Sequence, residues 1–309
     1  MQRSLNSNKN MLKRNKQAFS LVELSIVVLI LGILLAGISN YKNFVSKASL
    51  ISAQKITKSS GVLKIENIAL WLDATALNSF KPDGLTATDF FPDISDKQTV
   101  GWWQDVNLQK VYPARLNLLA DNLTNRPKYY VSVINNLPAL YFDGNDFLRT
   151  ENLPTNILAD QNEISIFVVQ NVKSSNLATF TINSSTQTTE NAGERIMLNA
   201  YYNNIFYFDF GNFNSSDRIT KTYTSQSYLA KPQLISAIKN GNSSSFFINA
   251  KLEVTQATTS QINTNLSRYL EIGTSFNGYI GEILIFNRAV KVREKALIEK
   301  YLLNKWKIK

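Results

Sequence analysis

One long apolar segment with a single acid near its entrance constrains this chain more than any other feature. Residues 19–38 carry Glu23 as their only charged residue. About 20 apolar residues, at ~1.5 Å rise per helical residue, are enough to cross the ~30 Å hydrocarbon layer of a bilayer. A carboxylate buried there is costly unless something pairs with it. The segment therefore predicts a membrane-spanning helix whose Glu23 needs a partner.

The residues in front of the apolar segment are basic. They include Arg3, Lys9, Lys13, Arg14 and Lys16 and contain no Asp or Glu. An excess of Lys and Arg is retained on the cytoplasmic side of a membrane. We therefore expect a single-pass topology in which the remainder of the chain is exported.

The stretch FSLVE at residues 19–23, with the apolar run behind it, resembles the class III signal of type IV pilins and pseudopilins. The resemblance implies that Ala18 ends a leader, and that prepilin peptidase cuts before Phe19 and methylates the new amino terminus. It also implies that the helix packs against other pilin-like subunits after leaving the bacterial inner membrane. The ammonium exposed by cleavage, in the same chain or a neighbouring one, would then pair with Glu23.

Two positions depart from the family pattern. Ala18 stands where the family usually has Gly. Many pilins also carry a helix-kinking Pro near the end of the apolar stretch, where this chain has Gly37 and Asn40. Because Gly is a poor helix former, we expect any local opening of the helix to begin at Gly37.

Two simpler interpretations of the segment stay open. An ordinary secretory signal has an apolar core of ~7–15 residues, no acid at its entrance and a small-x-small cleavage site. Glu23 does not fit that pattern, and residues 36–38 end in the bulky Ile38. A plain N-terminal anchor with an incidental Glu is the second interpretation. A lipoprotein is excluded because the chain has no Cys to acylate.

The net charge of the chain is largely a property of the leader. The formal charge is +10, from 33 basic and 23 acidic residues. Cleavage before Phe19 would remove five basic residues, leaving 28 against 23 and a charge of +5. Nucleic acid is therefore not expected as a partner. Without Cys, an exported domain must be held together by its core alone.

The chain divides by its periodicity into three parts. Apolar residues such as Tyr41, Val45 and Ile56 recur at roughly helical spacing beyond the apolar segment, which predicts an amphipathic extension of the helix. The Ser-Ser-Gly sequence at residues 59–61 is a helix stop. We predict a leader at 1–18, an anchor and assembly helix at 19–61, and one domain at 62–309.

That domain is predicted to be an antiparallel β-sandwich, because short runs rich in Ile, Val, Phe and Tyr follow one another between turn residues. Asp143-Gly144 and Asn240-Gly241 are the strongest hairpin signals, since Gly supplies the positive φ that such turns need. The expected strands are 68–72, 129–134, 139–142, 164–170, 178–182, 195–199, 205–210, 233–239, 245–249, 269–273 and 279–286.

Four segments of the domain, in order, resemble the concanavalin A-like lectin and laminin-G-like jelly roll. They are LWLDA at 70–74, WWQD at 102–105, NLPALYFDG at 136–144 and GYIGEILIFNRA at 278–289. The fold class that follows is mainly β, with a long N-terminal helix and a C-terminal helix flanking a jelly roll. For the terminal helix at 290–306 we favour a structural cover over one edge or end of the sandwich, with a basic membrane-surface or polyanion-binding helix as the alternative.

The composition argues against an enzyme. The chain has no His, which excludes a Ser-His-Asp system, a His-based metal centre and imidazole acid-base catalysis. Glycoside hydrolysis generally uses two carboxylates ~5–10 Å apart, and no Glu-x-Asp-x-x-Glu run is present. A glycan-active enzyme remains only as the weakest alternative, and no cofactor is expected.

The candidate binding residues lie in loops. Asp143, Asn145 and Asp146 form the most oxygen-rich loop and could bind Ca²⁺ or a sugar, although a plain hairpin turn is the simpler interpretation. Trp103 and Tyr202 are the aromatic candidates for a ligand contact. Each aromatic residue could equally be packing.

Two classes of function remain. In the first, the chain is a minor pilin or pseudopilin of a type IV pilus or type II secretion filament. Its lectin-like domain would then bind a glycan or another surface ligand for adhesion. In the second, it is a purely structural subunit or membrane-anchored surface protein without ligand. The expected location is the inner membrane, followed by a periplasmic pseudopilus or a cell-surface pilus.

Overall fold

The computed structural model describes residues 20–82, 94–109, 116–120, 122–150, 162–174, 179–184, 195–202, 204–211, 217–223, 228–262 and 268–309. The chain divides into two compact units, with the boundary between Val45 and Ser46. The first long helix, α1, runs from Leu21 to Ser59 and ends close to the expected boundary. Its last turns belong to the second unit, where Ala53 is buried in the core.

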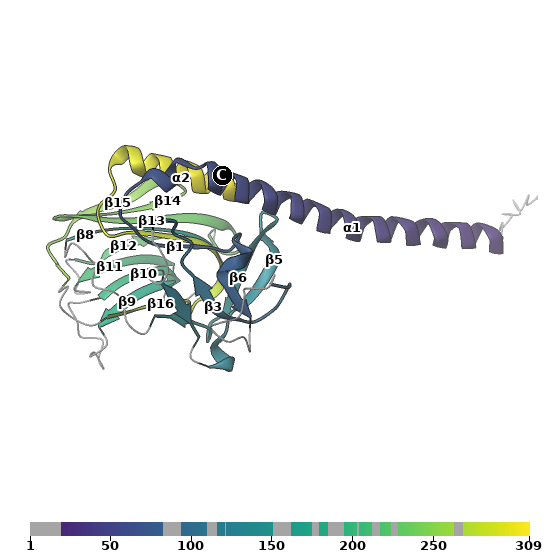
Figure 1. Cartoon of the computed structure of the whole chain (residues 1–309), viewed down its shortest axis with the longest axis horizontal. Coiled ribbons are helices and arrows are strands. Elements are labelled where there is room, and N and C mark those ends of the chain that lie inside the picture. Colours follow the sequence, from purple (N-terminus) through teal and green to yellow (C-terminus); the bar gives the residue numbers. More distant parts are fainter. Residues whose placement is uncertain are drawn as a thin grey trace, which may run out of the picture. The chain divides into compact units, whose positions relative to one another are not determined.

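The second unit is a sandwich of two antiparallel sheets, as predicted (Figure 1). In the described part of the chain, the first sheet has eight strands in the order β15-β14-β13-β8-β17-β6-β5, and β1 also pairs with β17. These strands are β1 (Ile68–Asp73), β5 (Lys128–Ile134), β6 (Leu137–Asp143), β8 (Glu163–Val172), β13 (Pro232–Asn240), β14 (Ser243–Ile248), β15 (Lys251–Ala257) and β17 (Asn277–Phe286).

The second sheet has nine strands among the described residues, in the order β12-β11-β10-β9-β16-β7-β4-β3-β2. They are β2 (Phe80–Pro82), β3 (Val100–Gln104), β4 (Asn117–Leu119), β7 (Leu148–Arg149), β9 (Phe180–Ser184), β10 (Arg195–Tyr202), β11 (Ile205–Gly211), β12 (Ile219–Thr222) and β16 (Arg268–Ile272). Short 3-10 helices are η1 (Gly61–Lys64), η2 (Leu77–Ser79) and η3 (Leu123–Asn125).

The two predicted hairpin turns have different outcomes. Asn240-Gly241 does connect the paired strands β13 and β14, with Asn240 opposite Ser243. Asp143-Gly144 does not form a hairpin, because it connects β6 of the first sheet to β7 of the second. Gly144 has the positive φ of 106° that was expected. The turn chemistry was therefore predicted correctly, but the partner of the strand was not.

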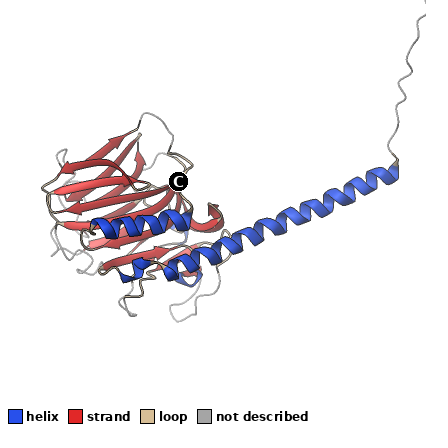
Figure 2. Cartoon of the chain, turned by 90° about the horizontal axis from the view of Figure 1, so that it is seen from above, coloured by secondary structure: helices blue, strands red, loops and turns tan. Residues whose placement is uncertain are grey.

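The core lies between the sheets and under the C-terminal helix α2 (Val292–Trp306). Every second residue of β11 faces inward, which buries Phe206, Phe208 and Phe210. Figure 2, seen from above, shows α2 lying over the strands, and α2 buries Ile298 and Leu302. The C-terminal helix is therefore present where it was predicted, and its apolar side is part of the core.

Candidate functional site

The start of α1 is capped by the side chains of Ser20 and Glu23, each of which accepts a hydrogen bond from a backbone N–H of the first turn. The backbone N–H of Ser20 donates to Oε2 of Glu23 at 2.8 Å, and the N–H of Val22 donates to Oγ of Ser20 at 3.3 Å. The bond from Glu23 back to the N–H of Ser20 is the half of a capping box that a Ser-x-x-Glu spacing allows, and the Ser20 hydroxyl caps the N–H of Val22 instead. Glu23 thus has a partner within its own chain before any processing. Ala18 and Phe19, the predicted cleavage positions, lie outside the described residues.

The first part of α1 presents large apolar side chains that are exposed among the residues that the structure describes. Their exposed fractions run from 49% at Ile26 to 85% at Leu21. Among the described residues, no helix combines the length and hydropathy of a membrane span. The exposed apolar residues are Leu21, Val22, Leu24, Ile26, Val27, Val28, Leu29, Ile30, Leu31, Ile33, Leu34 and Leu35.

The oxygen-rich loop after β6 is organised by its own backbone. The N–H of Asp143 donates to Oδ2 of Asp146 at 3.0 Å, and the N–H of Asn145 donates to Oδ1 of Asp143 at 2.9 Å. Burial raises the pKa of Asp146 to about 7, and the charge of Asp143 adds to this effect. Within the described residues, no group of three or more acidic side chains is placed to hold a metal ion.

The aromatic ligand candidates are separated by the fold. Trp103 is fully buried and stacks on Phe80 at 5.7 Å between ring centroids, so it is a core residue and does not face a ligand. Its neighbour Trp102 points the other way and is half-buried, with Nζ of Lys81 4.4 Å from its ring. Tyr202 belongs to β10, but its side chain lies outside the described part of the structure.

Trp102 belongs to a continuous row of residues across the nine-stranded sheet, which we call the outward row. Residues directly opposite each other on neighbouring strands share one face of a sheet. The row alternates along each strand with residues of the core, so it lies on the face turned away from the core. Its members, each opposite the next, are Lys81, Trp102, Leu119, Arg149, Glu271, Thr181, Met197 and Asp209.

One end of the outward row carries a carboxylate held by two guanidinium groups. Asp209 is fully buried and accepts from Nη2 of Arg195 at 2.7 Å and from Nε of Arg218 at 2.6 Å. The bond to Asp209 raises the pKa of Arg218. Arg218 also lies 4.7 Å above the ring of Tyr207. The face that carries the row therefore presents aromatic rings and two guanidinium groups fixed by a buried carboxylate, and rings and guanidinium groups are contacts that polar ligands use.

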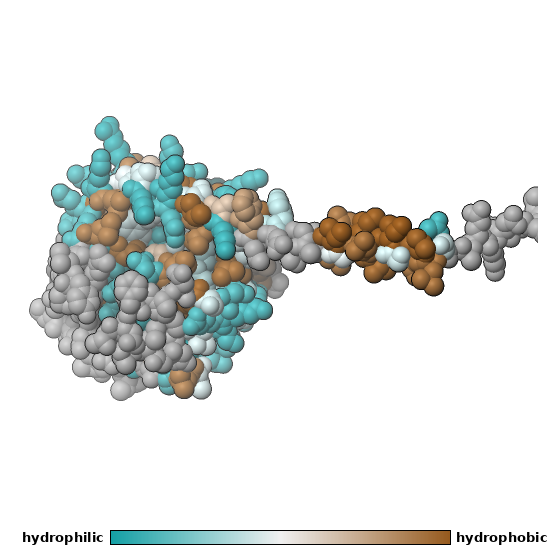
Figure 3. Space-filling model, turned by 45° about the vertical axis from the view of Figure 1, so that its right-hand side comes forward, coloured by the Kyte–Doolittle hydropathy of each residue, from teal (hydrophilic) through white to brown (hydrophobic). Residues whose placement is uncertain are grey.

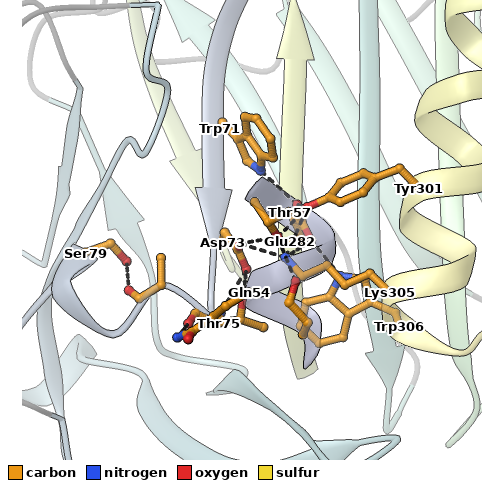
Figure 4. Close-up of polar contacts among 12 residues, drawn as sticks. Gln54, Thr57, Trp71, Asp73, Thr75, Ser79, Glu282, Tyr301, Lys305 and Trp306 are labelled. Atoms are coloured by element: carbon orange, nitrogen blue, oxygen red, sulfur yellow. Dashed lines mark hydrogen bonds and ion pairs between the residues drawn. The ribbon is translucent and has the colours of Figure 1, made fainter. Parts of the chain in front are cut away.

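A second cluster of charges is buried where β1, β17 and α2 meet (Figure 4). Nζ of Lys305 donates to Oδ2 of Asp73 at 2.6 Å and to Oε2 of Glu282 at 2.8 Å. The indole N–H groups of Trp71 and Trp306 also donate to Glu282, at 2.8 and 2.6 Å. Burial raises the pKa of Glu282, while Lys305 opposes that shift.

This cluster ties the end of α1 to the sandwich. The hydroxyl of Tyr301 donates to Oε1 of Glu282 at 2.7 Å and lies 3.0 Å from Oγ1 of Thr57, a residue of α1. Asp73 and Glu282 are almost completely buried, and every carboxylate oxygen of the pair accepts at least one hydrogen bond. Both carboxylates are therefore held inside the fold by hydrogen bonds.

Comparison with known protein families identifies the N-terminal segment. Residues 13–39 match the prokaryotic N-terminal methylation motif. The match covers three of the basic residues before the helix, Lys13, Arg14 and Lys16, together with the capped Glu23 and the exposed apolar run. The chain therefore carries a prepilin-type signal, as the sequence predicted. No curated protein is significantly similar to the chain.

Solved structures resemble the sandwich at low sequence identity. A GH54 α-L-arabinofuranosidase soaked with a cyclic sulfate inhibitor is 9% identical with a TM-score of 0.51, and the match covers 77% of this chain and 63% of that one. Domain 4 of a GH43 extracellular arabinanase from Geobacillus stearothermophilus, in complex with arabinotriose, is 15% identical with a TM-score of 0.43. That match covers 57% of this chain and 83% of the arabinanase domain. The binding domain of botulinum neurotoxin serotype D is 14% identical with a TM-score of 0.44. That match covers 76% of this chain and 51% of the neurotoxin domain. At these identities the likeness concerns the fold alone.

Sequence reasoning missed the outward row and the buried cluster around Lys305. The only local signal for the row was a polar or aromatic residue beside each core residue, as in Trp102 next to Trp103. For the cluster, an acid such as Glu282 inside an apolar strand was the available signal. Neither signal says which residue lies opposite on the next strand.

Proposed function

We propose that this chain is a pilin-like subunit, either a minor pilin or a pseudopilin, of a type IV pilus or type II secretion-type filament. The observation that carries the proposal is the exposed apolar helix with Glu23 at its capped start, inside a methylation motif. Prepilin peptidase would cut before Phe19 and methylate the new amino terminus. The helix would hold the subunit in the inner membrane, with the sandwich exported, and then pack against other subunits.

The cap at the start of α1 gives Glu23 two successive roles in this proposal. Before cleavage, Oε2 accepts from the N–H of Ser20. After cleavage, the ammonium of Phe19 lies one residue before Ser20, and Glu23 can accept from it or from the ammonium of a neighbouring subunit. An ion pair formed in an apolar surrounding favours one register between helices. Glu23 would therefore help to select the position of each subunit in the filament.

Intact-mass measurement and N-terminal sequencing of the native protein test the first step. A chain that starts at methylated Phe19 supports the proposal. Stable recovery of a working protein that still carries residues 1–18 contradicts it. Because Ala18 replaces the usual Gly, a substitution of Ala18 by a bulky residue should block cleavage and leave the longer form.

We further propose that the sandwich binds a glycan or another polar surface ligand through the outward row. Trp102 of the row and Tyr207, two residues before Asp209 on β11, offer aromatic rings, and Arg195 and Arg218, held in place by the buried Asp209, offer fixed charges, which together suit sugar rings and hydroxyl groups. The loop of Asp143, Asn145 and Asp146 stays a second candidate for this ligand or for Ca²⁺. The role is binding and not catalysis.

Glycan-array binding with filament assembly measured in parallel separates a binding subunit from a purely structural one. Trp102→Ala and Arg149→Ala should each abolish array binding while assembly continues. Tyr130→Ala and Arg293→Ala are the controls, since Tyr130 is half-buried on the other sheet and Arg293 is exposed on α2. An array without any bound glycan would favour the structural role. High copy number along whole filaments would argue against a minor subunit.

A further inference from the structure

The end of α1 and the outer side of α2 form a strongly basic face, which we call the basic face. The sequence of residues 46–65 contains no Asp or Glu. Figure 3 shows long hydrophilic side chains standing above smaller hydrophobic patches on the upper part of the sandwich. The exposed basic residues of the face are Lys47, Lys55, Lys58, Lys64, Lys291, Arg293, Lys300, Lys307 and Lys309.

The acids of α2 do not neutralise this face, because each already has a partner. Glu294 is paired with Arg288, at 2.7 Å from Nη1, and also accepts from the N–H of Lys291. Glu299 is buried, lies 2.7 Å from Nζ of Lys295 and accepts from Oγ of Ser236 at 2.9 Å. The exposed charge of the helix is therefore cationic, since its acids stabilise the fold.

Apolar side chains lie between these cations. Val292 is 84% exposed, Ile51 67% and Leu297 40%. A groove of about 380 Å³ is lined by Ile51, Lys55, Lys58 and Ser59. A second groove of about 260 Å³ continues from Ser59 to Leu297 and Lys300 on α2. The face therefore alternates apolar and cationic groups, as helices that lie in the interface of a membrane do.

We propose that the basic face binds the surface of a membrane that contains anionic phospholipids. Lysine ammonium groups suit diffuse phosphate headgroups, and the exposed Val292, Ile51 and Leu297 can enter the layer beneath them. Nucleic acid fits less well, because the aromatic residues of α2, Tyr301 and Trp306, are buried and cannot stack on bases.

The chain itself keeps this face close to a bilayer. The inference rests on the proposed function, in which the apolar part of α1 is embedded in lipid. Lys47 follows Leu35 by only twelve residues, and a chain of that length spans at most ~43 Å even when fully extended. Lys47, the first cation of the basic face, is therefore never farther than this from the lipid around Leu35.

A single labelled cysteine can detect this contact, because the chain has no Cys of its own. The full chain with Leu297→Cys carries an environment-sensitive dye and is reconstituted into vesicles of phosphatidylcholine, with or without phosphatidylglycerol. We expect the emission to shift to shorter wavelength only with phosphatidylglycerol, and the shift to be lost at high salt. A dye at Leu123→Cys, which is also exposed but lies on η3, should show no shift.

Charge reversal identifies the residues responsible. Lys55→Glu, Lys58→Glu and Lys300→Glu together should abolish the shift, whereas Lys128→Glu, Lys173→Glu and Lys231→Glu, exposed outside the basic face, should preserve it. Co-flotation of the chain with both vesicle types reports the anchor separately. If the chain floats with the vesicles but the dye emission does not shift, the contact of the basic face is wrong and the membrane anchor stands. A shift of the emission with duplex DNA and not with phosphatidylglycerol has the same meaning. Loss of flotation with both vesicle types contradicts the proposed membrane anchor and, with it, this inference.

Discussion

The ammonium of Lys305 lies 2.6 Å from a carboxylate oxygen of Asp73, although the two residues are 232 positions apart in the chain. Lys305 is fully buried, and its ammonium donates a second hydrogen bond to Glu282. Charges taken out of water are tolerated only when they are paired and hydrogen-bonded. This contact therefore makes the last helix, the first strand and the strand β17 depend on one another.

Replacing Lys305 by Met should be strongly destabilising, because it leaves Asp73 and Glu282 buried without a cation. We expect a loss of about 3–5 kcal/mol in the free energy of unfolding, measured by urea denaturation. Lys300→Met on the exposed side of the same helix is the control and should change stability by less than about 0.5 kcal/mol. Equal effects of the two substitutions would contradict the buried ion pair.

The tie between α1 and the sandwich can be weakened by Thr57→Val. This change removes the hydroxyl that lies 3.0 Å from the Tyr301 hydroxyl, and a hydrogen bond of this kind contributes about 1 kcal/mol. Amide hydrogen exchange should accelerate in the last turns of α1, while exchange in β8 stays unchanged. Ser59→Ala is the control, because Ser59 donates only to backbone carbonyls of its own helix. Unchanged exchange in Thr57→Val would show that the tie does not hold the helix end.

Gly281 is required by the close approach of Trp306. A Cβ at position 281 would lie 2.6 Å from the indole ring, nearer than side chains tolerate. Gly281→Ala should therefore cost about 1–3 kcal/mol of stability by overpacking, measured as a fall in thermal midpoint. Gly101→Ala, whose new methyl group would meet its nearest neighbour at 3.5 Å, should be tolerated. The reverse order of the two variants would refute this packing.

Asp146 should make the sandwich less stable as the pH rises. Its pKa is about 7 in the folded state and 3.8 without the fold, so the folded state holds the proton more tightly. The resulting stabilisation is present below about pH 4 and is lost as the pH rises through 7. Asp146→Asn should not show this loss. Raising the pH from 4 to 8 should lower the free energy of unfolding of the wild type by about 2–4 kcal/mol more than that of the variant. Parallel stability curves for the two proteins from pH 4 to 8 would disprove it.

Two substitutions of Glu23 separate its charge from its capping role. Glu23→Gln keeps an acceptor for the Ser20 N–H, whereas Glu23→Val loses it, at a cost of about 1 kcal/mol to the helix start. Both remove the charge that would pair with an ammonium. We expect both variants to insert into membranes and both to fail in filament incorporation. Normal incorporation of the Gln variant would show that Glu23 acts only as a cap.

The parts of the fold that were predicted correctly depend on contacts between near neighbours in the chain. The strand near 279–286 was expected because apolar residues fill a short run, and β17 occupies it. The strands β2, β3, β4, β7, β12 and β15 were missed. Segments as short as β4 and β7, of three and two residues, cannot show a period of two. The local sequence pattern also does not show which strands pair. Leu284 of β17 lies opposite Trp71 on one side and Phe167 on the other.

The N-terminal motif around Glu23 could be predicted from the sequence, whereas the outward row of the sandwich could not. The expected partner of Glu23 was an ammonium made by cleavage, and the structure adds a nearer one, the N–H of Ser20 three residues away. Trp103 was offered as a ligand contact, but the pleat turns it into the core and turns Trp102 outward. A shift of one residue in strand phase reverses that choice.

The sequence by itself indicated the methylation motif, the helix that follows it and the β character of the domain behind that helix. Each of these follows from residues a few positions apart, whose spacing is visible in the chain. Only the tertiary structure decided that Lys305 neutralises Asp73, and that Arg195 and Arg218 converge on Asp209. Such contacts depend on which strands and helices come together, and long-range pairing leaves no record in local spacing.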